Sequence, residues 1–227
     1  MLTLLATLWQ SDSAFPNGAF AFSNGIEGLA ELGQTLGRDN LSTTLISTLT
    51  HRWAGMDRIA VALAFAASDD IAELTEIDRR FDAATLPAPQ RKGSVRNGLA
   101  FLTSHARIGT PNAGALKAEV EARRMLGHLP VVQGALWRAC GLDATSALAA
   151  SAYGTVSAMA SAAVRLSLVG AVEAQRSLAA TLPVIAALIE ESRPAMPLTC
   201  DDFASMTPLL DIATMRHATS EVRLFSN

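Results

Sequence analysis

The longest nearly uncharged stretch of the sequence runs from Ala144 to Val172, and its only charged residue is Arg165. A stretch of this length could span a bilayer if it formed a helix. Its residues are mostly Ala, Ser, Gly and Thr rather than Leu, Ile and Phe, so its insertion into a membrane would be only weakly favourable. We therefore predict a buried helix of a helical bundle, with a membrane span as the alternative.

Two rows of small side chains run along this predicted helix. One row holds Ala147, Ser151, Thr155, Met159 and Ala163, and the neighbouring row holds Ala150, Gly154, Ala158 and Ala162. Such side chains let a second helix approach closely over several turns, so we predict that this is the central helix. Two interpretations of Arg165 stay open. It either complements the helix dipole and reaches water, or it faces a partner, where arginine is enriched.

Helical periodicity extends over most of the remaining chain. Apolar residues recur at helical spacing from Leu41 to Trp53, after the capping-type residues Asp39 and Asn40. Further helices are predicted to begin near residue 23 and at residue 71, and to span 56–67, 93–105, 115–126, 130–140, 143–169 and 171–191. Gly141 suits a C-terminal cap, and Thr199 with Asp202 suits a capping box. Sustained alternation of period two is nearly absent. We predict an all-α fold, a single-domain bundle of about eight to ten helices.

Charge and cysteine content exclude several classes of protein. The net charge of −3, without clustered Lys and Arg, gives no reason to expect binding to nucleic acid or to an anionic membrane. Cys140 and Cys200 have no CxxC companion, which argues against a disulfide framework and a structural zinc site. The N-terminus resembles no signal peptide, and the cysteine usage suits a reducing compartment. We expect a cytoplasmic protein.

The sequence shows no recognisable catalytic or metal-binding pattern. His51, His105, His128 and His217 fall in different segments without HxxxH or HExxH spacing, so we predict no metal site built from sequence-adjacent ligands. Nucleophile elbows, Walker loops and dinucleotide-binding glycine motifs are absent, and we predict that the protein is not an enzyme. Cys200, beside two aspartates, is more typical of a small buried side chain than of a metal ligand.

An unusual loop, SDSAFPNGAFAFSNGIEGLAE, lies between two leucine-rich segments and carries Phe15, Phe20 and Phe22. Pro16 fixes φ and Gly18 permits a tight turn, so the segment is a shaped turn that leads into a helix. Two interpretations of its phenylalanines stay open. They either fill the core beneath the loop or form an aromatic patch that a partner covers.

Three blocks of the sequence resemble the UreF family of urease accessory proteins. The first block matches the family's P-x-G-x-F-[SA]-[aromatic]-S-x-G-[LI]-E through Pro16, Gly18, Phe20, Ala21, Phe22, Ser23, Gly25, Ile26 and Glu27. The second, SAAVRLSLVGAVEAQRSL, places Arg165, Leu166, Gly170 and Gln175, and the third, PLLDIATMRHATSEVRLFSN, places Arg216, His217, Arg223, Leu224 and Phe225. Together the blocks cover nearly the whole chain.

The sequence departs from the family pattern at several positions. The usual Glu after the Arg-His pair is Ala218, an aromatic position nearer the tail is Glu221, and the chain ends in Ser-Asn rather than Arg-Ser. The Gly-Gly that often follows the proline is replaced by Asn17 and Gly18, and Gly170 is followed by Ala171 rather than Gln. These differences concern contacts with partners, especially at the tail, rather than the fold.

The resemblance implies a dimer-forming, non-catalytic scaffold. Such a protein joins the urease accessory protein of the D (or H) type and recruits the urease GTPase, whose activity it could stimulate or restrain, so that nickel enters apo-urease. It implies no tightly bound cofactor, with nickel handled only within the complex. The alternative is a helical ligand-binding or regulatory protein unrelated to urease.

The resemblance also assigns the segments that contact partners. The expected organisation is one domain over 1–227, with an N-terminal segment and aromatic loop at 1–22 and a partner-binding tail at 219–227. Expected partner-binding residues are Pro16, Gly18, Phe20, Phe22, Ser23, Glu27, Arg165, Gln175, Arg216, His217, Arg223, Leu224 and Phe225. Because Arg223, Leu224 and Phe225 lie beyond the last clear helical period, we expect this tail to be at risk of disorder in the free protein and to fold when a partner binds.

Overall fold

The computed structural model describes residues 1–18, 21–34, 37–191, 197–220 and 224–225. In this part of the chain it contains eleven α-helices and no β-strand, which confirms the predicted all-α fold. The helices are α1 (Leu2–Gln10), α2 (Ile26–Glu31), α3 (Arg38–Thr48), α4 (Asp57–Ala67), α5 (Ile71–Ala84), α6 (Ala88–Arg107), α7 (Ala113–Glu121), α8 (Leu129–Ala139), α9 (Ala144–Arg165), α10 (Ala171–Glu190) and α11 (Pro208–His217). A π-helical turn (Leu49–Trp53) extends α3, and a 3-10 turn (Cys200–Asp202) precedes α11.

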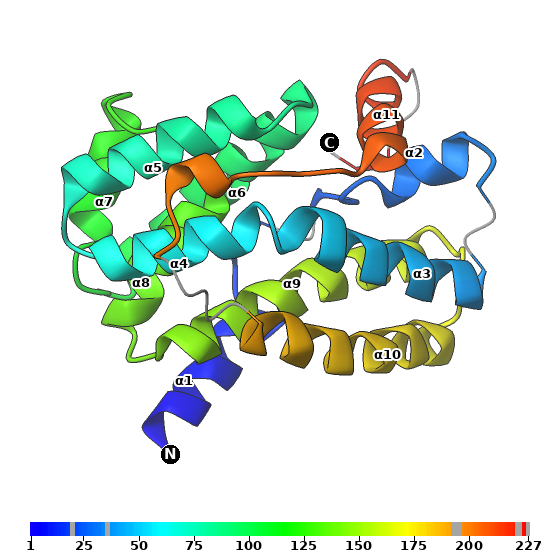
Figure 1. Cartoon of the computed structure of the whole chain (residues 1–227), viewed down its shortest axis with the longest axis horizontal. Coiled ribbons are helices and arrows are strands. Elements are labelled where there is room, and N and C mark those ends of the chain that lie inside the picture. The colour runs from blue at the N-terminus through cyan, green and yellow to red at the C-terminus, as the bar shows by residue number, and fades with distance from the viewer. Residues whose placement is uncertain (19–20, 35–36, 192–196, 221–223, 226–227) are drawn as a thin grey trace.

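Helix α9 lies at the centre of the bundle, as its small residues predicted (Figure 1). It packs against α1, α2, α3, α4, α8 and α10. Among the described residues two helices, α9 and α10, are long and apolar enough to cross a membrane, and 56% of the most apolar stretch of α9 is buried inside the bundle. That burial is what a core helix of a bundle shows, in agreement with the predicted buried helix.

A close helix crossing joins α4 and α8 rather than α9 and a neighbour. A Cβ atom at Gly134 in α8 would lie 2.5 Å from the carbonyl oxygen of Val61 in α4, so only glycine fits there. At Gly154 in α9, by contrast, an added Cβ would meet no atom within 4 Å. The prediction of a close helix along this row is therefore wrong at Gly154, because no helix among the described residues approaches that part of α9 closely.

Helix starts differ from the predictions where proline or glycine sets the first turn. Helix α6 begins at Ala88, five residues before the predicted start at 93, with Pro87 at its N-cap. Pro89 lies in the first turn, where proline is tolerated because the backbone N–H groups there have no partner within the helix. Helix α3 begins at Arg38 after Gly37, so the expected caps Asp39 and Asn40 lie inside it. The predicted C-terminal Gly141, with φ of +85°, and the Thr199 capping box are confirmed.

A buried carboxylate explains why α7 ends at Glu121 instead of the predicted 126. Asp78 is fully buried and accepts hydrogen bonds from the backbone N–H groups of Leu126 (2.7 Å), Gly127 (2.8 Å) and His128 (2.9 Å). These bonds hold the chain as a loop that leads directly into α8. The sequence pattern cannot show this, because the acceptor lies about fifty residues earlier.

Helix α1 is attached to the core through its last residue, Gln10. The side-chain carbonyl Oε1 of Gln10 accepts hydrogen bonds from Nε1 of Trp137 (2.9 Å) and Nε2 of His105 (3.2 Å). The other ring nitrogen of His105 lies 2.8 Å from the hydroxyl of Thr110. Burial lowers the pKa of His105 to about 4, so the ring is neutral at pH 7.

We expect this histidine to make the stability depend on pH. The unfolded chain binds a proton at His105 near pH 6.5, but the folded chain binds it only near pH 4, so the free energy of unfolding should fall as the pH is lowered through that interval. Thermal midpoints measured at about pH 7 and about pH 5 should differ less for His105→Gln than for the wild type. The exposed His51 provides the control, since His51→Gln should keep the wild-type difference. An unchanged difference in His105→Gln would contradict the assignment.

Candidate functional site

The aromatic loop contributes two of its phenylalanines to the core. Phe15 is 9% exposed and packs against the rings of Phe101 and His105, and Phe22 is 6% exposed with the Arg96 guanidinium 5.2 Å from its ring centroid. The core-filling interpretation therefore holds for these two residues, while Phe20 lies outside the described residues. Pro16 is exposed and Gly18 adopts φ of +77°, as a tight turn requires.

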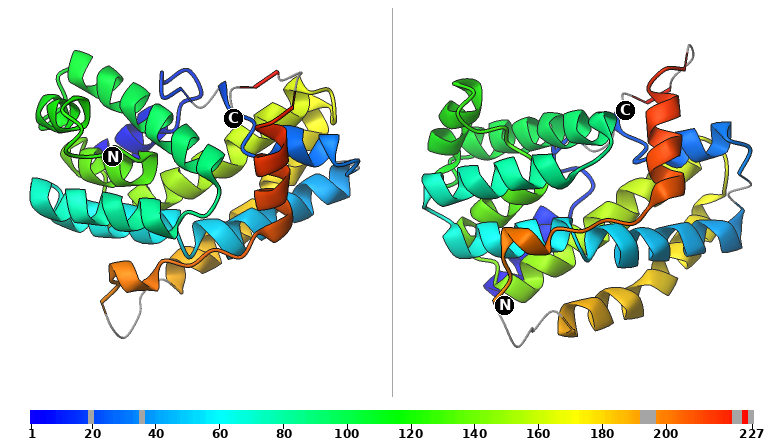
Figure 2. Two further views of the ribbon diagram at one scale, coloured as in Figure 1. Left: turned by 90° about the horizontal axis from the view of Figure 1, so that it is seen from above. Right: turned by 45° about the horizontal axis from the view of Figure 1, so that its top comes forward.

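The end of the loop presents helix α2 to helix α11. Ser23 is fully buried and Gly25, with φ of +87°, forms the N-cap of α2. A Cβ atom at Gly28 would overlap the backbone carbonyl of Ala213, so the glycine allows α2 and α11 to touch. The two helices lie side by side in both views of Figure 2, at the opposite end of the molecule from α7. This contact brings the first and third sequence blocks together.

The carboxylate of Glu27 holds the backbone of the C-terminal tail. Its Oε1 accepts the N–H of Leu224 at 2.8 Å, and its Oε2 accepts the N–H of Phe225 at 3.1 Å. Glu27 is only 6% exposed, so these bonds replace water around a nearly buried charge. A residue of the first block therefore fixes the path of the tail.

His217 lies between two carboxylates and is fully buried. Its Nε2 is 3.0 Å from Oε2 of Glu27, and its Nδ1 is 2.8 Å from Oε1 of Glu31, whose Oε2 accepts the Ser220 hydroxyl at 2.8 Å. Partial burial opposes ionisation of Glu31, but the hydrogen bonds from Ser220 and His217, with the positive charges nearby, hold its pKa below the usual range. Residues of α2 and α11 thus form a compact polar cluster.

The second sequence block reaches the same place through Arg165, at the C-terminal end of α9. Its guanidinium carbon lies 4.3 Å from the ring centroid of Phe225, a cation–π contact. Phe225 is 5% exposed, whereas its neighbour Leu224 is 73% exposed. Phe225 is therefore packed against the rest of the chain, because Glu27 holds its backbone and Arg165 covers its ring.

We call the set Glu27, Glu31, Arg165, His217 and Phe225 the motif junction. Each of the three sequence blocks contributes at least one residue to it. Arg216 is exposed on α11, Gln175 is exposed on α10 and makes none of these contacts, and Arg223 lies outside the described residues. Sequence reasoning missed Glu31, although its position one helical turn after Glu27 places both carboxylates on one face of α2.

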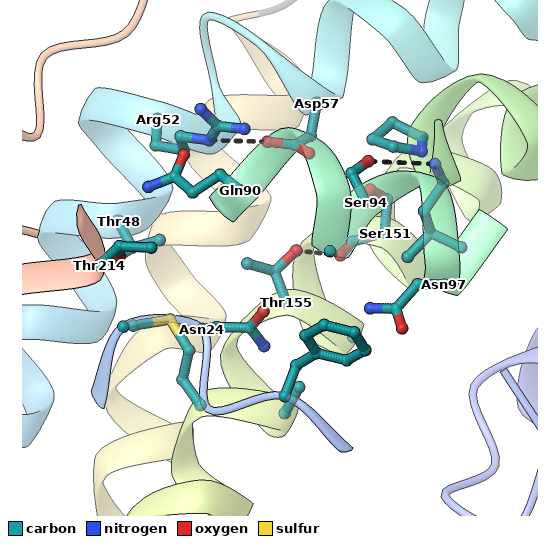
Figure 3. Close-up of a pocket in the computed structure, with 18 of the residues that line it drawn as sticks. Asn24, Thr48, Arg52, Asp57, Gln90, Ser94, Asn97, Ser151, Thr155 and Thr214 are labelled. Carbon is teal, nitrogen blue, oxygen red and sulfur yellow. Dashed lines mark hydrogen bonds and ion pairs between the residues drawn. The ribbon is translucent and has the colours of Figure 1, made fainter. Parts of the chain in front are cut away.

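A cavity of about 190 Å³, lined by both polar and apolar side chains, adjoins the motif junction (Figure 3). Asn24 and Gly25 of the first block, Ser151 and Thr155 of α9, and Thr214 of α11 line it. On its wall Nε of Arg52 lies 3.6 Å from Oδ2 of Asp57. Burial raises the pKa of the Asp57 carboxyl, and the Arg52 charge opposes that rise.

The cavity explains the uncovered part of α9. Gly154 and Ala158 line it, and the neighbouring Ser151 hydroxyl accepts a hydrogen bond of 3.0 Å from the indole N–H of Trp53. The small residues there face this cavity instead of a closely packed second helix. The cavity and the motif junction share the loop before α2 and the helix α11, so they form one candidate functional region.

Comparison with known proteins gives the same family that the three sequence blocks resemble. Residues 37–182 match the family described as UreF. The chain is similar to the urease accessory protein UreF of Arthrobacter sp. (strain FB24), with 29% identity over 222 residues, 97% of this chain and 96% of that protein. It is 30% identical to the UreF of Paenarthrobacter aurescens (strain TC1) over 97% of this chain and 96% of that protein. It is also 30% identical to UreF 1 of Brucella melitensis biotype 1, over 99% of this chain and 92% of that protein.

Proposed function

Because the chain belongs to the UreF family of urease accessory proteins, we propose that it is a non-catalytic scaffold for urease maturation. In this proposal it joins the D/H-type accessory protein, recruits the urease GTPase and supports the delivery of nickel into apo-urease in the cytoplasm. The observation that carries the proposal is the motif junction, where three blocks distant in sequence hold the C-terminal tail in one place. The alternative of a helical protein unrelated to urease is set aside by the family assignment.

The surface beside the motif junction suits a protein partner. On α11 the side chains of Leu209, Ile212 and Met215 are 50%, 48% and 41% exposed and recur every three residues. Leu224 of the tail is 73% exposed. Apolar side chains that gather in this way at the surface mark an interaction site. We assign this surface to the D/H-type partner.

Reconstitution tests the proposed function directly. Apo-urease, the D/H-type protein, the GTPase, GTP and nickel should yield active urease only when this chain is added. Measuring GTP hydrolysis in the same mixture distinguishes stimulation from restraint of the GTPase. Equal urease activation with and without the chain would contradict the scaffold role.

We expect the purified chain to be at least a dimer. The family resemblance implies this, and α10 offers further exposed apolar side chains, with Val172 at 61% and Leu182 at 51% exposed. Light scattering at micromolar concentration should therefore report a mass of at least twice 23.8 kDa. A solution that contains only the 23.8-kDa species would count against the dimer.

Nickel is treated in this proposal as cargo of the assembled complex. Calorimetry on the isolated chain should then reveal no site for Ni²⁺ with sub-micromolar affinity. A stoichiometric site of that affinity in the isolated chain, lost on mutation of His51 or His217, would contradict this part of the proposal.

A further inference from the structure

We propose that the cavity beside the motif junction binds a small, neutral, planar molecule of amide type, which carries both N–H donors and a carbonyl acceptor on a single ring. This inference concerns the isolated chain, goes beyond the scaffold role and does not depend on it. It rests on buried polar atoms of the cavity wall, on the balance of charge around them and on the size of the cavity.

The amide of Asn97 is the first of these polar groups. Asn97 lies on α6, is only 7% exposed and lines the cavity, and in Figure 3 its side chain points toward the other lining residues. Its Oδ1 has no hydrogen-bond partner among the described residues. A buried polar atom of this kind destabilises the fold unless a bound molecule donates a hydrogen bond to it.

Gln90 presents a second acceptor to the cavity. Its Nε2 donates to Oδ1 of Asp211 at 3.0 Å, while its buried Oε1 has no partner within the described part of the chain. The hydroxyls of Thr48, Thr155 and Thr214 also line the cavity, but each donates its proton to the carbonyl four residues earlier in its own helix, at 2.8 to 3.0 Å. The ligand must therefore bring its own N–H donors.

The charge of the cavity wall favours a neutral ligand. Arg52 and Asp57 are the only charged residues among the described ones that line the cavity, and they have opposite signs. Nε of Arg52 lies 3.6 Å from Oδ2 of Asp57, which is longer than a hydrogen bond, so the guanidinium keeps N–H donors for another acceptor. A carbonyl oxygen suits those donors, whereas an anion would compete with Asp57 for the same group.

The cavity has room for one ring. Its volume of about 190 Å³ exceeds that of a cavity of roughly 150 Å³ that holds benzene. Phe22, Leu129 and Met159 supply apolar walls against which a flat ring packs while its edge meets polar groups. Arg52 and Asn97 lie on opposite sides of this space in Figure 3, so the ligand should accept from the first and donate to the second.

Two glycines shape the cavity. A Cβ atom at Gly93 of α6 would lie 3.2 Å from the ring of Phe22, so glycine lets that ring come close to the helix. At Gly154 of α9 an added Cβ would meet no atom within 4 Å, and Gly154 lines the cavity. A side chain introduced at Gly154 should therefore fill the cavity without a clash, which gives a test that does not involve the hydrogen-bonding groups.

Titration of the purified chain with nicotinamide and with uracil, followed by NMR, tests the site. Both are neutral planar amides of one ring, and we expect saturable binding with a dissociation constant of roughly millimolar or lower, as ligands of this size reach. The side-chain NH₂ signals of Asn97, assigned by their loss in Asn97→Leu, should shift during the titration. Benzoate and benzylamine, an anion and a cation of similar size, should bind at least tenfold more weakly.

Two variants and one control separate binding from folding. Asn97→Leu and Gly154→Leu should each weaken nicotinamide binding at least tenfold. The thermal midpoint of Asn97→Leu should not fall below that of the wild type, because the substitution removes a buried acceptor without a partner. Gly114→Leu is the matched control, since Gly114 lies on the distant helix α7, has open space around it and does not line the cavity. It should bind like the wild type.

Several results would overturn the proposal. These are the absence of saturable binding of both amides to the wild type, unchanged binding in both Asn97→Leu and Gly154→Leu, and tighter binding of benzoate or benzylamine than of nicotinamide. Binding of the linear mimic N-acetylglutaminamide in place of the ring amides would assign the cavity to a side chain of a protein partner instead. Circular dichroism checks that each variant is folded, and Gly154→Leu keeps the test valid if Asn97→Leu unfolds. These measurements need no partner protein, so failure of this site and failure of the scaffold role are distinguishable.

Discussion

Deletion of Arg223 to Asn227 is expected to abolish co-purification with the D/H-type accessory protein, and with it urease activation in a reconstituted system. The deletion removes the exposed Leu224 and frees the Glu27 carboxylate that holds the tail. Helical content and the dimer should persist, because the deleted residues follow the last helix. Pull-down yield and circular dichroism measure the two effects.

The structure indicates that this deletion also lowers the free energy of unfolding. Phe225 is 5% exposed, and losing its burial should lower the free energy of unfolding by about 2 kcal/mol. For a chain of this size the thermal midpoint should fall by roughly 5 °C. The deletion therefore needs a companion variant that leaves Phe225 in place.

Leu224→Asp is that companion. It removes an exposed apolar side chain while leaving the backbone N–H groups bound to Glu27 and the ring of Phe225 under Arg165. We expect a midpoint close to wild type and a pull-down yield reduced at least tenfold. If the truncated chain still captures the partner at wild-type yield, the tail is a terminus without binding function, and the partner surface lies elsewhere, with the aromatic loop as the next candidate.

Arg165→Ala should weaken partner recruitment by about tenfold or more, which corresponds to about 1.4 kcal/mol. The guanidinium covers the ring of Phe225 at the end of the central helix, so its loss frees the tail that the partner is proposed to bind. Arg165 itself is exposed, and an exposed cation–π contact contributes only about 0.5–1 kcal/mol. The thermal midpoint should therefore stay within a few degrees of the wild-type value.

Two further variants define the role of Arg165. Arg165→Lys keeps the charge but loses the planar group that lies over the ring, so we expect intermediate recruitment. Arg176→Ala removes an exposed arginine from α10 and should bind the partner like the wild type. A large loss of stability in Arg165→Ala with unchanged recruitment would show that the residue is structural only.

Local patterns in the sequence determined the helices, the central position of α9 and the membership of the family. Apolar periodicity and caps depend on residues within one or two helical turns, so the Thr199 capping box and Gly141 after α8 could be predicted without a structure. Predicted helix boundaries were wrong where a residue distant in the sequence binds the backbone. The carboxylate of Asp78 accepts hydrogen bonds from the loop before α8, so α7 ends five residues before its predicted end.

The motif junction could not be derived from the sequence, although most of its residues belong to recognised blocks. The hydrogen bond between His217 and Glu31 joins residues 186 positions apart, and that between Phe225 and Glu27 joins residues 198 apart. Sequence analysis left Arg165 between the helix dipole and a partner, whereas the structure places it over Phe225. It likewise found the histidines scattered, whereas the fold surrounds His217 with two carboxylates. The physical reason is that helix formation depends on near neighbours, while the partner of a buried charge depends on which distant segments the close contact of α2 and α11 at Gly28 brings together.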